Sequence, residues 1–281
     1  MVYTMKKLLF FVLSLSFSVT CFGYYLPSQS YLQIESGFGF STFSSLNQGI
    51  TASAANLEND FGAQAAGKEF KPLNFEVPIL VKLGLRPFTG SAAHNMLLSI
   101  RSGVLLTHSW NSGIFSDSVI NFNYAVAIVP IEIGLEYQLF SFGFIGGTLS
   151  VSGGIAAGAY FGFFRQGYSE SPAVTGTDLS QFPKVYSGIG FGGSVSLNTV
   201  WQISSSIGIS GSVFYRYANI GSLKDGNNQL YINQTGFTAA ASQPANSEAA
   251  GINLSGVGFS FGINFAFGEK RITNIPEGVY R

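Results

Sequence analysis

The chain has 281 residues, a formal net charge of zero, and only 10% charged residues against 15% aromatic ones. No cluster of Lys and Arg suits nucleic acid, and a single cysteine, Cys21, excludes a disulfide framework or a thiolate metal site. Outside the first 23 residues, no apolar run reaches the roughly 18 residues that a membrane-spanning helix needs.

The chain begins with a segment typical of a secretory signal. Met5, Lys6 and Lys7 form a basic start, and residues 8–17 form an apolar run of about ten residues, too short to cross a bilayer. A lipoprotein would need cleavage just before Cys21, but the preceding Ser-Val-Thr matches such a site poorly. We expect cleavage after Gly23, so that residues 1–23 are a signal peptide and the rest is exported.

Eight later segments alternate large apolar residues with small or polar ones, as strands with two different faces do. Each has about ten to sixteen residues, and a tilted membrane strand needs about 9 to 11. The segments are 31–41, 74–86, 96–107, 124–139, 148–163, 186–202, 207–217 and 256–267.

The last of these segments shows which face meets which solvent. Val257, Phe259, Phe261, Ile263 and Phe265 share one face, and glycine, serine, asparagine and alanine occupy the other. About six large residues from each of eight strands exceed the interior of an eight-stranded barrel, which side chains just fill. We therefore predict that the aromatic face meets lipid and the small polar face lines the lumen.

The intervals between the segments alternate between long and short, as in bacterial outer-membrane barrels. The fold predicted is an eight-stranded antiparallel up-and-down transmembrane β-barrel over residues 24–267, all-β, with a periplasmic tail at 268–281. Four long outer loops are expected at about 42–73, 108–123, 164–185 and 218–255.

Two similar short motifs accompany this pattern: Phe-Glu-Val-Pro-Ile at 75–79 and Ile-Val-Pro-Ile-Glu at 128–132, each followed by Gly-Leu. With them the chain resembles the small OmpA/OmpX-type barrels and the "outer membrane protein β-barrel domain" families, including rickettsial-type surface antigens. The resemblance implies a porin-like or surface-antigen protein of a Gram-negative cell envelope. Because proline cannot donate to a strand ladder, we expect Pro78 and Pro130 at the outer ends of their strands.

Seven charged side chains share the inward phase of the predicted strands. A Lys or Arg on the lipid side at mid-depth costs about 2 to 4 kcal/mol, so their common phase supports the inside-out assignment. We expect an internal ion-pair network that plugs the lumen, with a selectivity or proton-relay path as the alternative. The residues are Glu35, Glu76, Lys82, Arg101, Glu132, Glu136 and Arg216.

Aromatic residues near strand ends match the girdles at the two membrane interfaces, with the two tryptophans at opposite rims. The predicted girdle consists of Trp110, Trp201, Tyr137, Tyr215, Tyr217 and Phe163.

His108 and the following Ser109 lie where the His/Ser pair of outer-membrane lipid A deacylases and acyltransferases would be. The spacing of those enzymes is not matched, and the alternation turns His108 toward lipid. We therefore predict that His108 is a girdle or loop residue, and we expect no catalytic residues, no metal and no cofactor.

These patterns predict a non-enzymatic integral protein of the bacterial outer membrane that contacts its lipid and lipopolysaccharide. Its loops would serve envelope integrity, adhesion or recognition of an extracellular partner, and no nucleic acid is expected to bind. A small-solute channel is the alternative. It would need a lumen network that opens, or extra strands within 42–73 and 218–255, because wider barrels leave space inside.

Overall fold

The computed structural model describes residues 30–48, 73–86, 95–115, 118–171, 184–228, 230 and 251–267, with backbone alone at 109–122 and 168–171. Eight strands form one closed barrel in which every strand pairs antiparallel with its neighbour in the chain. Strands β1 and β8 complete the ring, from Ser30 opposite Phe267 to Phe43 opposite Leu254. The strands are β1 Ser30–Phe43, β2 Phe75–Leu85, β3 Met96–Phe115, β4 Ser118–Phe144, β5 Gly147–Ser171, β6 Lys184–Gln202, β7 Ile207–Ile220 and β8 Ile252–Phe267.

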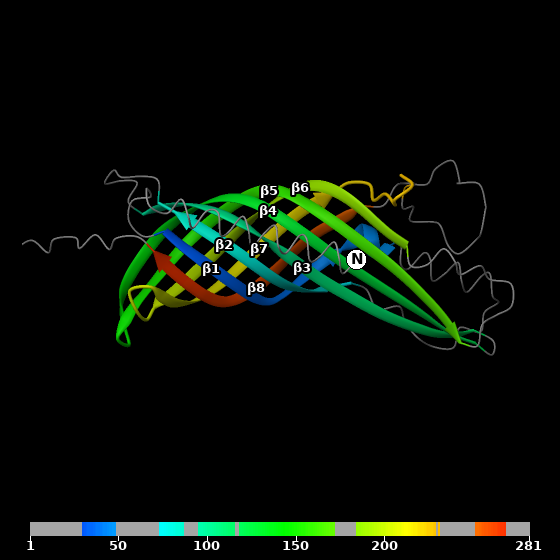
Figure 1. The fold of residues 1–281 in the computed structure, drawn as a ribbon, viewed down its shortest axis with the longest axis horizontal. Helices are drawn as coiled ribbons and strands as arrows, with labels where there is room; N and C mark the ends of the chain where they lie inside the picture. Colours follow the sequence, from blue (N-terminus) through cyan, green and yellow to red (C-terminus); the bar gives the residue numbers. More distant parts are fainter. Residues whose placement is uncertain are drawn as a thin grey trace, which may run out of the picture.

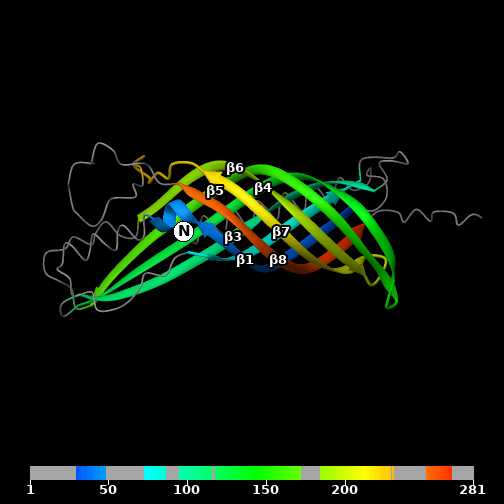
Figure 2. The ribbon, with the colours of Figure 1, turned by 180° about the vertical axis from the view of Figure 1, so that it is seen from behind.

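The strands are strongly tilted and wrap around a common axis, as the two opposite views in Figures 1 and 2 show. We call the end where β1 begins and β8 ends the turn end, and the opposite end the loop end. At the turn end, Ile145 and Gly146 alone join β4 to β5. Both have positive φ, 40° and 73°, as a two-residue type I′ hairpin requires.

The alternation predicted from the sequence sorts side chains between the two faces. Large apolar residues point out of the barrel, with exposed fractions of 62% for Phe261 and 76% for Phe191. Gly262, next to Phe261, points inward, where an added Cβ would lie 2.0 Å from the carbonyl oxygen of Ile34. The interior is therefore too closely packed at this point for any side chain.

The third and fourth strands are longer than the sequence indicated. The predicted loop at 108–123 is instead a continuation of the β3–β4 hairpin, whose ladder runs from Thr107 opposite Val126 to Phe115 opposite Ser118. Strand pairing overrides the low strand propensity of the serines, asparagines and glycine in this stretch. In the same way β5 continues to Ser171, opposite Val119, so residues 164–171 are strand rather than loop.

Pro130 also departs from the expectation. It lies in the middle of β4, opposite Tyr160 of β5, and not at the outer end of the strand. On its other side the β3–β4 ladder is interrupted between Ser102–Ile131 and Leu105–Ile128. The missing amide hydrogen of proline therefore falls where the neighbouring strand makes no ladder pair.

Candidate functional site in the barrel lumen

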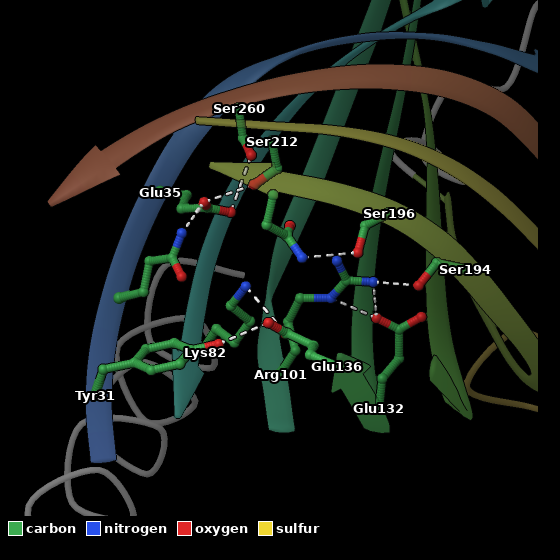
Figure 3. Close-up of polar contacts among 12 residues, drawn as sticks. Tyr31, Glu35, Lys82, Arg101, Glu132, Glu136, Ser194, Ser196, Ser212 and Ser260 are labelled. Carbon is green, nitrogen blue, oxygen red and sulfur yellow. Dashed lines mark hydrogen bonds and ion pairs between the residues drawn. The ribbon is translucent and has the colours of Figure 1, made fainter. Parts of the chain in front are cut away.

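The seven predicted lumen residues all lie inside the barrel, each less than a tenth exposed. They come from β1, β2, β3, β4 and β7, and the barrel closure brings six of them together as three ion pairs. Figure 3 shows five of the seven converging from β1, β2, β3 and β4.

The first pair lies nearest the turn end. Lys82 Nζ of β2 is 3.1 Å from Glu136 Oε1 of β4. Tyr31 donates its hydroxyl hydrogen to the other carboxylate oxygen of Glu136 at 2.9 Å, and Lys82 lies 5.5 Å from the centre of the Tyr31 ring. This arrangement gives both oxygens of a buried carboxylate a donor, which a buried charge requires.

The second pair joins adjacent strands, because Arg101 of β3 is the ladder partner of Glu132 of β4. The guanidinium of Arg101 donates to Glu132 from two nitrogens, with Nε 2.6 Å from Oε2, and reaches Ser194 of β6 at 2.5 Å. Tyr160 donates to the other Glu132 oxygen. Strands β3, β4, β5 and β6 are thus tied together through one carboxylate and one guanidinium.

The third pair is the most deeply buried. Arg216 Nη1 of β7 lies 2.8 Å from Glu76 Oε1 of β2, and the guanidinium carbon is 4.6 Å from the centre of the Phe214 ring. Among the described residues, Glu76 Oε2 and the Nε and Nη2 of Arg216 have no hydrogen-bond partner. Only one oxygen of Glu76 and one nitrogen of Arg216 therefore have a hydrogen-bond partner, whereas both oxygens of Glu132 have one.

Glu35 is the acid without a basic partner, because four acids face three bases. Its carboxylate accepts hydrogen bonds from Gln33, from Ser212 at 2.8 Å and from Ser260 at 2.9 Å. All three donors are neutral, so this carboxylate is solvated by the protein rather than neutralised (Figure 3). Sequence reasoning missed Ser212 and Ser260, although both share the inward phase of their strands.

Much of the loop-end half of the lumen is filled by apolar side chains, which the sequence did not lead us to expect. Tyr124 stacks on Phe164 with ring centres 6.0 Å apart, and Phe164 stacks on Tyr186 at 6.2 Å. These and their neighbours form what we call the apolar plug: Phe43, Leu46, Leu73, Leu80, Leu105, Tyr124, Val126, Ile128, Tyr160, Phe164, Tyr186, Ala218, Ile220, Leu223, Ile252 and Leu254.

Parts of the chain outside the strands complete the plug. Leu46 lies in a helical turn after β1, and Asn47 exchanges two hydrogen bonds with the backbone of Leu73, at 2.9 and 2.8 Å. After β7, the backbone of Lys224 pairs with that of Ser187 and places Leu223 in the plug. The expected wholly polar lumen is therefore wrong for the loop-end half, since strand alternation identifies an inward side chain but not what fills the interior.

The predicted girdle residues occupy different positions. Tyr137, Tyr215 and Tyr217 are exposed on the outer surface, and Phe163 lies half-buried on the same face. Trp201 lies at the turn end, where it donates to the Phe144 carbonyl at 3.2 Å and packs edge-on against the Phe144 ring. The backbone of Trp110 is in β3, and its side chain lies outside the described residues.

His108 is exposed and follows the outward phase of β3. Within the described parts of the chain, no group of three or more His, Cys, Asp or Glu residues could hold a metal ion. No helix among those residues is long and apolar enough to span a membrane.

No protein-family model matches the chain, and no curated protein matches it. It is similar in structure to the outer membrane protein OprG from Pseudomonas aeruginosa, at 8% identity and a TM-score of 0.37, covering 87% of this chain and 98% of that one. It is also similar to Ail of Yersinia pestis, in complex with the heparin analogue sucrose octasulfate, at 9% identity and a TM-score of 0.39, covering 86% of this chain and 100% of that one. A third similar structure is that of a major outer membrane protein from Thermus thermophilus, at 13% identity and a TM-score of 0.39, covering 85% of this chain and 99% of that one. Because identities and scores are low, the barrel assignment rests on the strand pairing of this chain itself.

Proposed function

We propose that this chain is a non-enzymatic barrel of the bacterial outer membrane, which seals its own lumen and presents a protruding sheet for recognition of an extracellular partner. Its outer apolar surface contacts the lipid and lipopolysaccharide of that membrane. The short turns then face the periplasm and the loop end faces outward, following the general arrangement of such barrels.

The observation that carries the sealed barrel is the apolar plug above the ion pairs. Eight strands enclose an interior that side chains just fill. Here apolar side chains fill much of the loop-end half, and the side chains of three ion pairs occupy further space in the interior. An ion crossing this lumen would have to lose its hydration among buried leucine, isoleucine and aromatic side chains, which is strongly unfavourable.

The recognition role is supported by the length of β3, β4 and β5. The β2–β3 ladder reaches only to Leu106, whereas β3 continues to Phe115 with β4 alongside it. The three strands therefore extend together beyond their neighbours, toward the lower right in Figure 1. A paired sheet holds its outermost residues in a fixed arrangement, which lowers the entropy cost of binding a partner.

A small-solute channel is the competing function, and planar-bilayer recording separates the two. The purified full chain should give no stable unitary conductance when it is incorporated into planar bilayers, while a general porin prepared in the same way conducts. A stable, reproducible conductance step from the wild-type chain would contradict the sealed barrel and support the channel.

A lipid A-modifying enzyme is the third possibility. The His108 side chain is exposed and follows the outward phase of β3, away from the carboxylates of the lumen, which supports the non-enzymatic proposal. Mass spectrometry of lipid A from cells with and without the protein would reveal such an activity as a mass shift.

A further inference from the structure

The turn-end half of the lumen contains a cavity that the ion pairs do not fill, which we call the turn-end basin. Its volume is about 120 Å³. A single water needs roughly 10–15 Å³ of such space, so the basin has room for a small organic molecule and not merely for one or two waters. Its walls come from every strand except β7.

The walls of the turn-end basin are rich in neutral hydrogen-bonding groups. Five carboxamide side chains and three serines line it. Two of these groups are fully buried and unsatisfied: the Oε1 of Gln33 and the Oγ of Ser30 have no hydrogen-bond partner among the described residues. An amide oxygen can only accept, so the occupant must bring a donor to Gln33.

The charges around the basin balance. Lys82 and Arg86 line it, as does Glu136, and the carboxylate of Glu35 lies directly behind Gln33. Two bases and one acid line the basin, and the second acid, Glu35, lies outside the lining and accepts from Gln33, so the formal charges at and next to the wall sum to zero. A neutral occupant satisfies this balance.

The walls also include apolar surface from Leu97, Val200 and Ala266. Such surface contributes nothing to the binding of a hydrated ion, but it suits the carbon skeleton of a small molecule. The occupant must therefore combine several hydroxyl groups with a short hydrocarbon backbone and carry no charge.

We propose that the turn-end basin binds a small, neutral, polyhydroxylated molecule of the polyol class. Hydroxyl groups donate to Gln33 Oε1 and Ser30 Oγ and accept from the neighbouring amides, including Asn198 and Asn264. The carbon backbone lies against the apolar wall. The site lies on the opposite side of the ion pairs from the apolar plug, so ligand binding here does not require a conducting lumen.

Saturation-transfer NMR on the refolded full chain tests this, in a detergent without a sugar headgroup such as lauryldimethylamine oxide. The first probe is D-sorbitol. The second is 1,6-hexanediol, which has the same number of carbons as sorbitol but only two hydroxyl groups, and the third is gluconate, a negatively charged counterpart of sorbitol. Sorbitol should bind at least about tenfold more tightly than hexanediol, since each additional net hydrogen bond contributes on the order of a few-fold in affinity. Gluconate should bind no more tightly than sorbitol.

Asn264→Leu places an apolar side chain in the basin and should weaken sorbitol binding by about tenfold, the loss of one to two hydrogen bonds. Ser150→Leu fills the same space from β5 and replaces Asn264→Leu as the test variant if Asn264→Leu does not fold. Ser205→Ala, in the exposed β6–β7 turn, is the matched control and should bind as wild type does. The proposal is overturned if sorbitol gives no saturable signal, if both leucine variants bind it normally, or if gluconate binds much more tightly than sorbitol.

Discussion

At the scale of single residues, the partners of a buried carboxylate decide what its charge contributes. Glu132 faces a guanidinium, and its removal leaves Arg101 buried and charged without its counterion. Glu35 receives only neutral donors, two of them serine hydroxyls that can also accept. The two acids are equally buried, but the loss of their charges should have different consequences.

We predict that Glu132→Gln lowers the free energy of unfolding by about 3 to 5 kcal/mol, because it breaks a buried pair and leaves one charge uncompensated. Glu35→Gln should change it by no more than about 1 kcal/mol, because the amide oxygen can keep the donors Gln33 and Ser212 while the amide nitrogen donates to Ser260, whose hydroxyl can accept. Urea titration of both variants in lipid vesicles measures the difference. Equal losses would show that Glu35 is coupled to the cations and that the assignment of separate pairs is incorrect.

At the scale of elements, alternation alone predicted all eight strands and the phase of each. In β8 the observed faces agree with the predicted ones, with Phe261 outside and Gly262 inside. The strand ends were less predictable. Residues 108–115 and 118–123 mix serine, asparagine and glycine with strand formers such as Trp110, Ile114 and Ile120, so composition did not separate strand from loop there, whereas the cross-strand pairing does.

The apolar plug was missed for a related reason. Leu80 and Leu105 follow the inward phase, so the sequence contained a signal: apolar residues on both faces in the middle of β2 and β3. Leu46 and Leu73 lie in a stretch that composition described as a solvated loop. Their burial goes with the hydrogen bonds between Asn47 and the backbone of Leu73, a contact between separate segments that no local pattern encodes.

The barrel should fold without the protruding part of the β3–β4 hairpin. Replacing residues 110–123 with Asn-Gly joins Ser109 to Tyr124, which are opposite each other in the ladder, through a favoured two-residue turn. The change leaves the apolar plug and the ion pairs intact, so the free energy of unfolding should fall by no more than about 1 kcal/mol. Urea titration and the heat-dependent gel shift check this, and a variant that cannot fold would contradict a hairpin that serves recognition alone.

At the scale of the whole molecule, apolar and polar side chains are distributed in the opposite way to a soluble protein. The outer surface is apolar, while charged and hydrogen-bonding side chains are buried in the interior. Formal charge sums to zero over the sequence, and six of the seven charged lumen residues form ion pairs. The sealed lumen, the proposed location and the turn-end basin all depend on this inside-out arrangement.

Urea unfolding of three variants at adjacent positions of β8, refolded in lipid vesicles, tests that arrangement most directly. Phe261→Leu should be nearly silent, because hydrocarbon has no shaped pocket to leave empty, and Phe261→Arg should cost about 2 to 4 kcal/mol. Gly262→Leu should cost at least about 1 to 3 kcal/mol through overpacking, since even a Cβ would meet the Ile34 carbonyl and Glu35. The opposite pattern, with Gly262→Leu as stable as wild type and Phe261→Leu strongly destabilised, would show that the aromatic face is a core and that this is not a membrane barrel.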